Sequence, residues 1–220
     1  MKKISSIIGI LVIVLVLGGC FPKDNEAKSE FVLVTIADRN FKIPRGYFDG
    51  RSPSGKDTES VVLEYALPDF KILPTHPLHR EERQKLIQAG LMRSMLLEAE
   101  RNRPPAHVSA ENLMRGRNYQ KQEGDFWGLE KYQRPKETGK YPVVWDDFFI
   151  ERNKRGEIIS FLFCSPPDKD KVPSCNHRFM DKGLVYQIHW NIRELKNWQQ
   201  QKKAAINFID SLEIHVTKGE

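Results

Sequence analysis

Several patterns that mark common enzyme classes are missing from this sequence of 220 residues. It contains neither HExxH nor GxSxG, and the Ser54-Gly55-Lys56 segment lacks the preceding glycine frame of a phosphate-binding loop. It has only three cysteines, and none of them lies in a CxxC pair of the kind common in structural zinc sites. We therefore expect a protein that is not an enzyme and that holds no metal and no other cofactor.

An excess of charge of one sign is also lacking. The formal net charge is +6, and it falls to +4 (33 − 29) for the 201 residues (220 − 19) that follow position 19. The charges are interspersed, without an arginine-rich run or a basic strip interleaved with aromatics, so nucleic acid is a poor candidate partner. A chain of this length forms one domain or two small ones, and its apolar content suffices for a core.

The apolar run at the N-terminus is too short to span a bilayer. It covers residues 4–17, which is 14 residues, whereas a spanning helix needs about 20. Lys2 and Lys3 precede it, and Leu17-Gly18-Gly19-Cys20 ends it. A positive start, a short apolar segment and small residues before a cleavage site are typical of a secretory signal. A short uncleaved anchor and a buried core helix are the alternatives.

The Leu17-Gly18-Gly19-Cys20 segment resembles the lipobox of bacterial lipoproteins, in which leucine lies three places before the cysteine. The resemblance implies that Cys20 carries a diacylglycerol and that a membrane is one partner of the mature protein. It also implies three segments, namely a signal peptide at 1–19, a lipidated tether at 20–30 and a periplasmic domain at 31–220. In Gram-negative lipoproteins an aspartate after the cysteine tends to retain the protein in the inner membrane, so Phe21 favours the outer membrane.

Lipidation of Cys20 leaves Cys164 and Cys175 as a pair, in a compartment that permits disulfides. The ten residues between them include three prolines and alternating charges, which indicate a loop. We expect a Cys164–Cys175 disulfide that clamps two neighbouring strands. Closing a loop of this size stabilises a fold by about 3 kcal/mol in the chain-entropy model. The alternative is a metal site on Cys175 and His177, with Cys164 as a further ligand.

The patterns of apolar residues predict an α+β fold, with an antiparallel sheet of about six strands and helices on one face. The segments with strand composition are 31–37, 60–67, 126–132, 146–152, 157–164, 175–180 and 184–190. Residues 78–101 predict a long middle helix, and the polar stretch 106–123 predicts a loop. A C-terminal helix is expected from Asn191 and Glu194, which match a capping box. Its apolar face consists of Leu195, Trp198, Ala205, Ile206, Ile209 and Leu212.

Three kinds of residue are candidates for chemistry or binding. The histidines lie at 76, 79, 107, 177, 189 and 215, and His177 and His189 fall on adjacent predicted strands, where they can approach each other. Asp146 and Asp147 form a carboxylate pair at a strand start, which we expect to be a solvated edge. We expect the tryptophans at 127, 145, 190 and 198 to lie in the core. Exposed aromatics at Phe126-Trp127 or Tyr47-Phe48 are the alternative, as anchors of a protein interface.

The last third of the chain resembles small proteobacterial envelope proteins of unassigned function. The resemblance lies in Cys164, in Cys175-Asn176-His177-Arg178-Phe179 and in Leu195-Lys196-Asn197-Trp198, and Phe41-Lys42-Ile43-Pro44 also suits that group. Some of these proteins resemble immunity lipoproteins that guard against type VI secretion effectors. The resemblance implies a protein-binding module that neutralises a secreted toxin, although the basic charge departs from the acidic surface of a substrate mimic. A structural or assembly lipoprotein and an envelope hydrolase are the alternatives.

Overall fold

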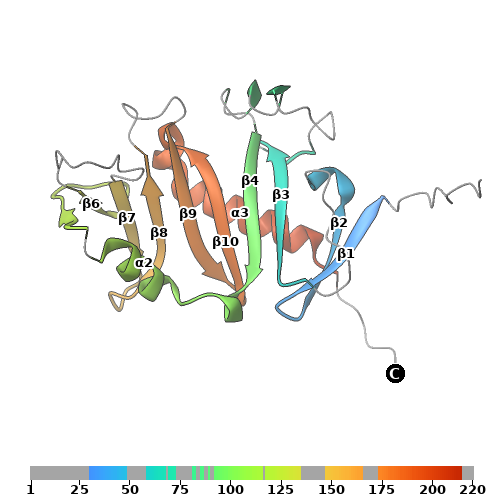
Figure 1. The fold of residues 1–220 in the computed structure, drawn as a ribbon, viewed down its shortest axis with the longest axis horizontal. Coiled ribbons are helices and arrows are strands. Elements are labelled where there is room, and N and C mark those ends of the chain that lie inside the picture. Colours follow the sequence, from blue (N-terminus) through green and yellow to red (C-terminus); the bar gives the residue numbers. More distant parts are fainter. Residues whose placement is uncertain are drawn as a thin grey trace, which may run out of the picture.

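The computed structural model describes residues 30–48, 58–67, 69–72, 81–82, 85–86, 89, 92–115, 117–134, 147–165 and 173–214. Within these residues the chain forms two antiparallel sheets and two α-helices (Figure 1). The small sheet is a hairpin of β1 (Phe31–Ile36) and β2 (Arg39–Pro44). Its two-residue turn, Ala37 and Asp38, has positive φ angles of 52° and 62°, as tight hairpin turns require.

The large sheet has eight strands, and every neighbouring pair is antiparallel. In spatial order the strands are β3 (Ser60–Ala66), β4 (Met92–Ala99), β10 (Leu184–Asn191), β9 (Ser174–Asp181), β8 (Ile158–Cys164), β7 (Asp147–Arg152), β6 (Glu130–Gln133) and β5 (Gln120–Lys121). The chain therefore starts this sheet at one edge, crosses to the other edge, and returns to the middle with β9 and β10.

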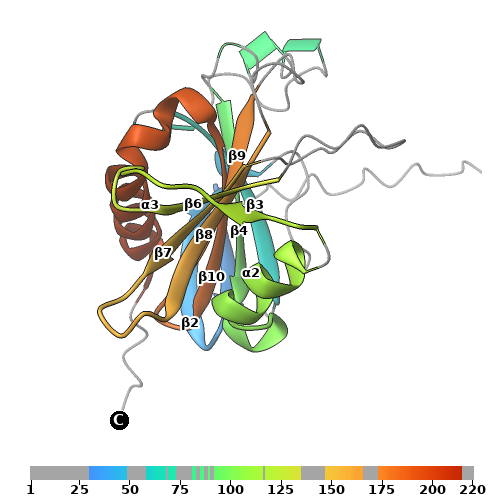
Figure 2. The ribbon, with the colours of Figure 1, turned by 90° about the vertical axis from the view of Figure 1, so that its left-hand side faces the viewer.

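The two α-helices cover opposite faces of the large sheet (Figure 2). Helix α3 (Trp198–Leu212) lies across one face, after the 3₁₀ segment η3 (Ile192–Asn197). Helix α2 (Ala106–Met114) packs on the other face, against β8 and β9. Two further 3₁₀ turns are η1 (Arg45–Tyr47) and η2 (Glu100–Asn102). The prediction of helices on one face only is therefore wrong.

Successive side chains of a strand point to opposite faces of the large sheet, and apolar side chains lie on both faces. In β8, Leu162 faces α3 and Phe161 faces α2, and both side chains are fully buried. The core under α3 is the larger one, and it also receives the inner face of the β1–β2 hairpin. The core under α2 consists of Ala106, Ala110, Phe148, Ile150, Ile158 and Phe161. The strand β8 is therefore an inner strand of the sheet that is covered on both faces.

The α+β class and the C-terminal helix are confirmed. The side chain of Asn191 accepts a hydrogen bond from the Arg193 amide at 3.0 Å, and the helix opens as a 3₁₀ turn before it becomes α3. The predicted apolar face of this helix packs on the sheet, with Leu195, Trp198, Ala205 and Ile209 buried.

Two predictions of secondary structure are wrong. Residues 92–99 form β4 rather than the end of a helix, because this segment pairs with β3 on one side and with β10 on the other. In the preceding part of the predicted helix, the described residues 81–82 and 85–86 are helical, as predicted, and most of the others lie outside the described residues. The polar stretch 106–123 contains α2, which turns the small residues Ala106, Ser109 and Ala110 toward the sheet.

Residues 1–29 are not described, so the predicted signal peptide, Cys20 and all of the tether except Glu30 lie outside the described residues. In the part of the chain that the structure describes, every helix is too short or too polar to cross a membrane. The described domain begins at Glu30, directly before β1.

Candidate protein-binding surface

The predicted disulfide between Cys164 and Cys175 is present, with a bond length of 2.05 Å. The two cysteines are direct partners in the register of β8 and β9, so the bond clamps two neighbouring strands as expected. Both side chains are fully buried. The bond uses both sulfur atoms, so neither cysteine offers a thiolate to a metal. The alternative of a metal site on Cys175 and His177 therefore lacks its sulfur ligand.

His177 is a core residue on the α3 side of β9. Its side chain is fully buried, and its Nε2 lies 2.7 Å from the Oγ of Ser160, which is also fully buried. The imidazole packs against the rings of Phe179 and Trp190, with centroids 4.8 Å and 4.7 Å away. Burial, with a smaller contribution from the charge of Lys202, holds the pKa of His177 well below its ordinary value. This histidine is therefore neutral, and its hydrogen bond to Ser160 links β9 to β8.

The two histidines on β9 and β10 do not approach each other. His177 is paired in register with Ile188, so the side chain of His189 leaves the sheet on the opposite face. There His189 lies 3.2 Å from the amide nitrogen of Asn176. His107 is exposed on α2, whereas His76, His79 and His215 lie outside the described residues.

Asp147 is not the solvated edge residue that its position predicted. Its carboxylate forms an ion pair with the Nζ of Lys131 at 3.0 Å, and only 15% of the Asp147 side chain is exposed. The ammonium group of Lys131 also lies within 5.7 Å of the ring centroids of Phe126 and Phe149. Aromatic rings therefore shield this ion pair from water, while Asp146 lies outside the described residues.

A small hollow lies between β4, β10 and η3. It is lined by Tyr65, Leu67, Arg93, Ile188, His189, Trp190, Glu194 and Gln201. Burial, followed by the charge of Arg93, lowers the pKa of His189 here. The cavity volume is about 10 Å³, which is enough for about one water molecule. This hollow is therefore too small to hold a substrate.

The tryptophans fall into two groups. Trp190 and Trp198 are buried in the core under α3, as predicted, and Trp145 lies outside the described residues. Trp127, in contrast, is 49% exposed. Tyr47 and Phe48, the other candidate anchors, are buried. Of the aromatic residues proposed from the sequence as interface anchors, Trp127 is the one that the structure presents to solvent.

Trp127 lies at the tip of a tight turn formed by residues 125–129, which we call the Trp127 turn. The amide of Leu129 donates to the carbonyl of Phe126 at 3.2 Å, and the amide of Gly128 donates to the Asp125 carboxylate at 3.0 Å. The two central residues have positive φ angles, 59° for Trp127 and 81° for Gly128. A bulky residue rarely adopts this conformation, and such residues cluster at functional sites.

Contacts with helix α3 and strand β7 hold the Trp127 turn in place. The buried Trp198, at the start of α3, donates its indole Nε1–H to the carbonyl of Trp127 at 2.9 Å. Phe126 packs edge-on against Phe149 of β7, and Leu129 is buried. These contacts fix the backbone of Trp127, so binding through its exposed indole requires no further ordering of the turn.

The Trp127 turn lies beside the polar start of helix α3. A side chain added at Gly128 would contact the amide of Gln199, which places the turn over the first turn of α3. Exposed residues near this end of the helix are Lys196, Asn197, Gln199, Gln200 and Lys203. An exposed aromatic residue on a fixed turn matches the anatomy of protein interfaces, which concentrate binding energy in a few aromatic anchors.

The sequence contained a signal for this turn. Asp125 and Gly128 are turn formers at the correct spacing, but the strand predicted over 126–132 began directly after Asp125 and included Gly128. The strand β6 begins at Glu130, after the turn.

Comparisons with protein-family models and with curated proteins give no match. Among solved structures, the chain is similar to the immunity protein Smlt3025 of the type IV secretion system of Stenotrophomonas maltophilia. The TM-score is 0.61 at 19% identity, over 84% of this chain and 94% of that chain. It is also similar to the iron-regulated outer membrane lipoprotein FrpD of Neisseria meningitidis, with a TM-score of 0.45 at 12% identity, over 83% and 93% of the two chains. At this identity, the likeness to Smlt3025 establishes a shared fold.

Proposed function

We propose that this protein is a lipid-anchored binding module of the bacterial envelope, that it neutralises a secreted toxin, and that it is not an enzyme. The observation that carries the proposal is the Trp127 turn, which presents an indole that is 49% exposed on a fixed backbone. Tryptophan is enriched among residues that dominate the energy of protein interfaces. Smlt3025 shares the fold and is an immunity protein, which supports the same role here.

Two further features support an envelope location. The lipobox-like segment ending at Cys20 indicates export and lipidation, and the Cys164–Cys175 disulfide suits an oxidising compartment. The toxin is then one that reaches the periplasm from another cell. The sequence resemblance favours a type VI effector, whereas Smlt3025 serves a type IV system, so attackers that lack one or the other system separate these two versions.

The binding role is tested with the product of a neighbouring toxin gene, purified and titrated with the protein by calorimetry. We expect Trp127→Ala to weaken binding by about 2–4 kcal/mol, which is about 30-fold to 1000-fold in Kd. The matched control is Val62→Ala on β3. The exposed fractions of the two side chains are nearly equal, at 50% for Val62 and 49% for Trp127. Equal affinities for wild type and Trp127→Ala, with unchanged unfolding curves, would show that the turn is not the anchor.

The protective role is tested in living cells. We expect deletion of the gene to make cells sensitive to attack by their siblings, and expression of the wild-type protein to restore survival. If the deletion strain survives as well as the parent, the immunity role is wrong. In that case a pull-down that recovers secretion-apparatus or outer-membrane components, without a toxin, would favour a structural or assembly lipoprotein. Peptidoglycan or lipid hydrolysis by the purified protein would favour an envelope hydrolase.

A further inference from the structure

The β1–β2 hairpin has one face in the core and one face exposed. On the exposed side, which we call the hairpin outer face, lie Phe31 and Leu33 of β1 and Lys42 of β2. Leu33 is 51% exposed and is paired directly with Lys42 in the register of the hairpin. The ammonium group of Lys42 lies 4.3 Å from the centroid of the Phe31 ring. The hairpin outer face thus combines exposed apolar surface with a cation.

The exposed cation of the hairpin outer face favours an anionic partner. The hairpin itself, residues 31–44, contains the cations Arg39 and Lys42 and the anion Asp38. Arg39 is engaged by carboxylates of the C-terminal helix, but Lys42 is exposed and forms no ion pair within the described ranges. Lysine beside apolar side chains suits the boundary of a bilayer, where the stem contacts apolar groups and the ammonium stays among phosphates.

The distance to the predicted anchor is short. Phe31 follows Cys20 by 11 residues, and a fully extended chain spans at most about 3.6 Å per residue, or about 40 Å in total. A lipid on Cys20 therefore holds the start of β1 within this distance of the bilayer. Of all described strands, β1 is the one attached nearest to the lipid.

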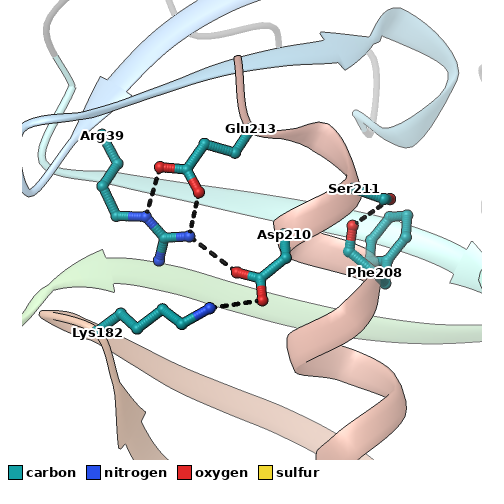
Figure 3. Close-up of polar contacts among 6 residues, drawn as sticks. All are labelled: Arg39, Lys182, Phe208, Asp210, Ser211 and Glu213. Carbon is teal, nitrogen blue, oxygen red and sulfur yellow. Dashed lines mark hydrogen bonds and ion pairs between the residues drawn. The ribbon is translucent and has the colours of Figure 1, made fainter. Parts of the chain in front are cut away.

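The hairpin is tied rigidly to the end of α3 (Figure 3). The guanidinium of Arg39 donates to both oxygens of Glu213, at 3.0 Å and 2.7 Å, and to Asp210 at 2.9 Å. Lys182, in the turn between β9 and β10, donates to the other oxygen of Asp210 at 2.8 Å. The amide of Ile214 donates to the carbonyl of Asn40 at 2.8 Å. The orientation of the hairpin therefore sets the orientation of the helix and the sheet.

The Trp127 turn lies at the other end of this helix. Trp198, which holds the turn, is the first residue of α3, whereas Asp210 and Glu213 lie at its last turn and just beyond. The helix has 15 residues, which corresponds to about 22 Å. Figure 1 shows the β1–β2 hairpin and β6, which follows the Trp127 turn, at opposite ends of the molecule.

We propose that the hairpin outer face lies on the anionic headgroup surface of the membrane, with Leu33 and Lys42 in contact with lipid, and that the Trp127 turn faces the periplasm. The inference rests on the lipid anchor of the proposed function. It explains how a short tether is compatible with capture of a partner, because the anchor and the binding turn lie at opposite ends of a rigid domain.

The test uses the full-length lipidated protein in vesicles of phosphatidylethanolamine and phosphatidylglycerol that contain a spin-labelled quencher lipid. A fluorophore is attached to Leu33→Cys, and in a matched sample to Trp127→Cys, since these side chains are equally exposed in the structure. We expect the lipid to quench the label at position 33 several-fold more strongly than the label at 127. We also expect Lys42→Glu to reduce quenching at 33, and phosphatidylcholine vesicles to do the same.

Equal quenching at both positions, or stronger quenching at 127, would overturn the orientation. Mass spectrometry of the vesicle-bound protein tests the anchor separately, and an unmodified Cys20 would overturn both the anchor and the orientation. Toxin binding measured by calorimetry in solution does not involve the membrane. A protein that binds toxin and is lipidated, but is quenched equally at both positions, would therefore contradict the orientation alone. Far-UV circular dichroism of each labelled variant confirms that it is folded.

Discussion

His177 and His189 occupy adjacent strands, yet their side chains leave the sheet on opposite faces. His177 is enclosed by Ser160, Phe179 and Trp190, and its Nδ1 has no hydrogen-bond partner among the described residues. Adding a proton there would place a charge in an apolar core near the cation of Lys202. The core therefore tolerates this histidine only as a neutral ring, which makes stability depend on pH.

We expect the free energy of unfolding to fall as the pH decreases below about 6.5. The folded-state pKa of His177 is lowered, so the unfolded chain binds the proton first and acid favours unfolding. The stabilisation is complete above the unfolded pKa and is lost toward the folded pKa, by up to about 1.4 kcal/mol per pH unit. Urea unfolding between about pH 7.5 and pH 5 measures this slope.

The matched variant for this prediction is His177→Gln, whose amide can still bond to Ser160 but does not titrate. We expect a flatter dependence on pH in this variant, with a remainder from His189, whose pKa is also lowered. His107→Gln, at an exposed position of α2, is the control substitution. An unchanged slope in His177→Gln would contradict a buried neutral histidine.

At the scale of secondary-structure elements, β4 shows how tertiary contacts override local preference. Its sequence, MRSMLLEA, has the composition of a helix, yet it lies between β3 and β10 and is hydrogen-bonded along both edges. A central strand satisfies all of its backbone groups through its neighbours, and β4 also buries Met95 and Leu97 under α3. Neither the hydrogen bonds to the neighbouring strands nor the burial under α3 can be inferred from the sequence of this segment alone.

The β8–β9 pair carries the disulfide, and we expect its removal to be costly. Replacing both Cys164 and Cys175 by alanine should lower the free energy of unfolding by about 2–4 kcal/mol, because the bond closes a loop between residues 11 positions apart. Urea unfolding of the double variant, compared with the wild type with and without reductant, measures the effect. The reduced wild type should match the double variant, and a change below about 0.5 kcal/mol would show that the bond is not stabilising.

The contact between β2 and α3 depends on the shape of the Arg39 side chain. We expect Arg39→Lys to destabilise the protein by about 1–3 kcal/mol, since lysine cannot bond two carboxylates in this forked geometry. Lys182→Met is the control from the same network. Because Lys182 is 59% exposed, its loss should cost less than about 1 kcal/mol. Equal effects of the two substitutions in urea unfolding would contradict the role of the bidentate contact.

At the scale of the whole molecule, one core joins the two sheets. The inner face of the β1–β2 hairpin, the α3 face of the large sheet and the helix itself contribute to a single cluster of buried side chains. Phe41 and Ile43 of β2 are fully buried within it. The hairpin is therefore part of the folded unit, although its backbone pairs only with itself in the sheets.

We expect the protein to unfold in a single cooperative transition. Loss of the hairpin would expose the core under α3, so a state with only the hairpin unfolded should not accumulate. Tryptophan fluorescence, to which the buried Trp190 and Trp198 contribute, and far-UV circular dichroism should give the same midpoint in urea. The Arg39→Lys variant should shift both midpoints together. Two separate transitions would show that the hairpin unfolds on its own, if the first one removed only the circular dichroism signal of strands.

The sequence by itself determined those features that depend on neighbours along the chain. Alternation of apolar residues defined most of the strands, the apolar face at helical spacing defined α3, and the proline-rich loop between Cys164 and Cys175 indicated the disulfide. Only the tertiary structure decided the strand order, the strand state of β4, and the burial of His177 together with the exposure of Trp127. The physical reason is that local patterns set periodicity and turns, whereas strand partners and covered faces depend on contacts between residues far apart in the sequence.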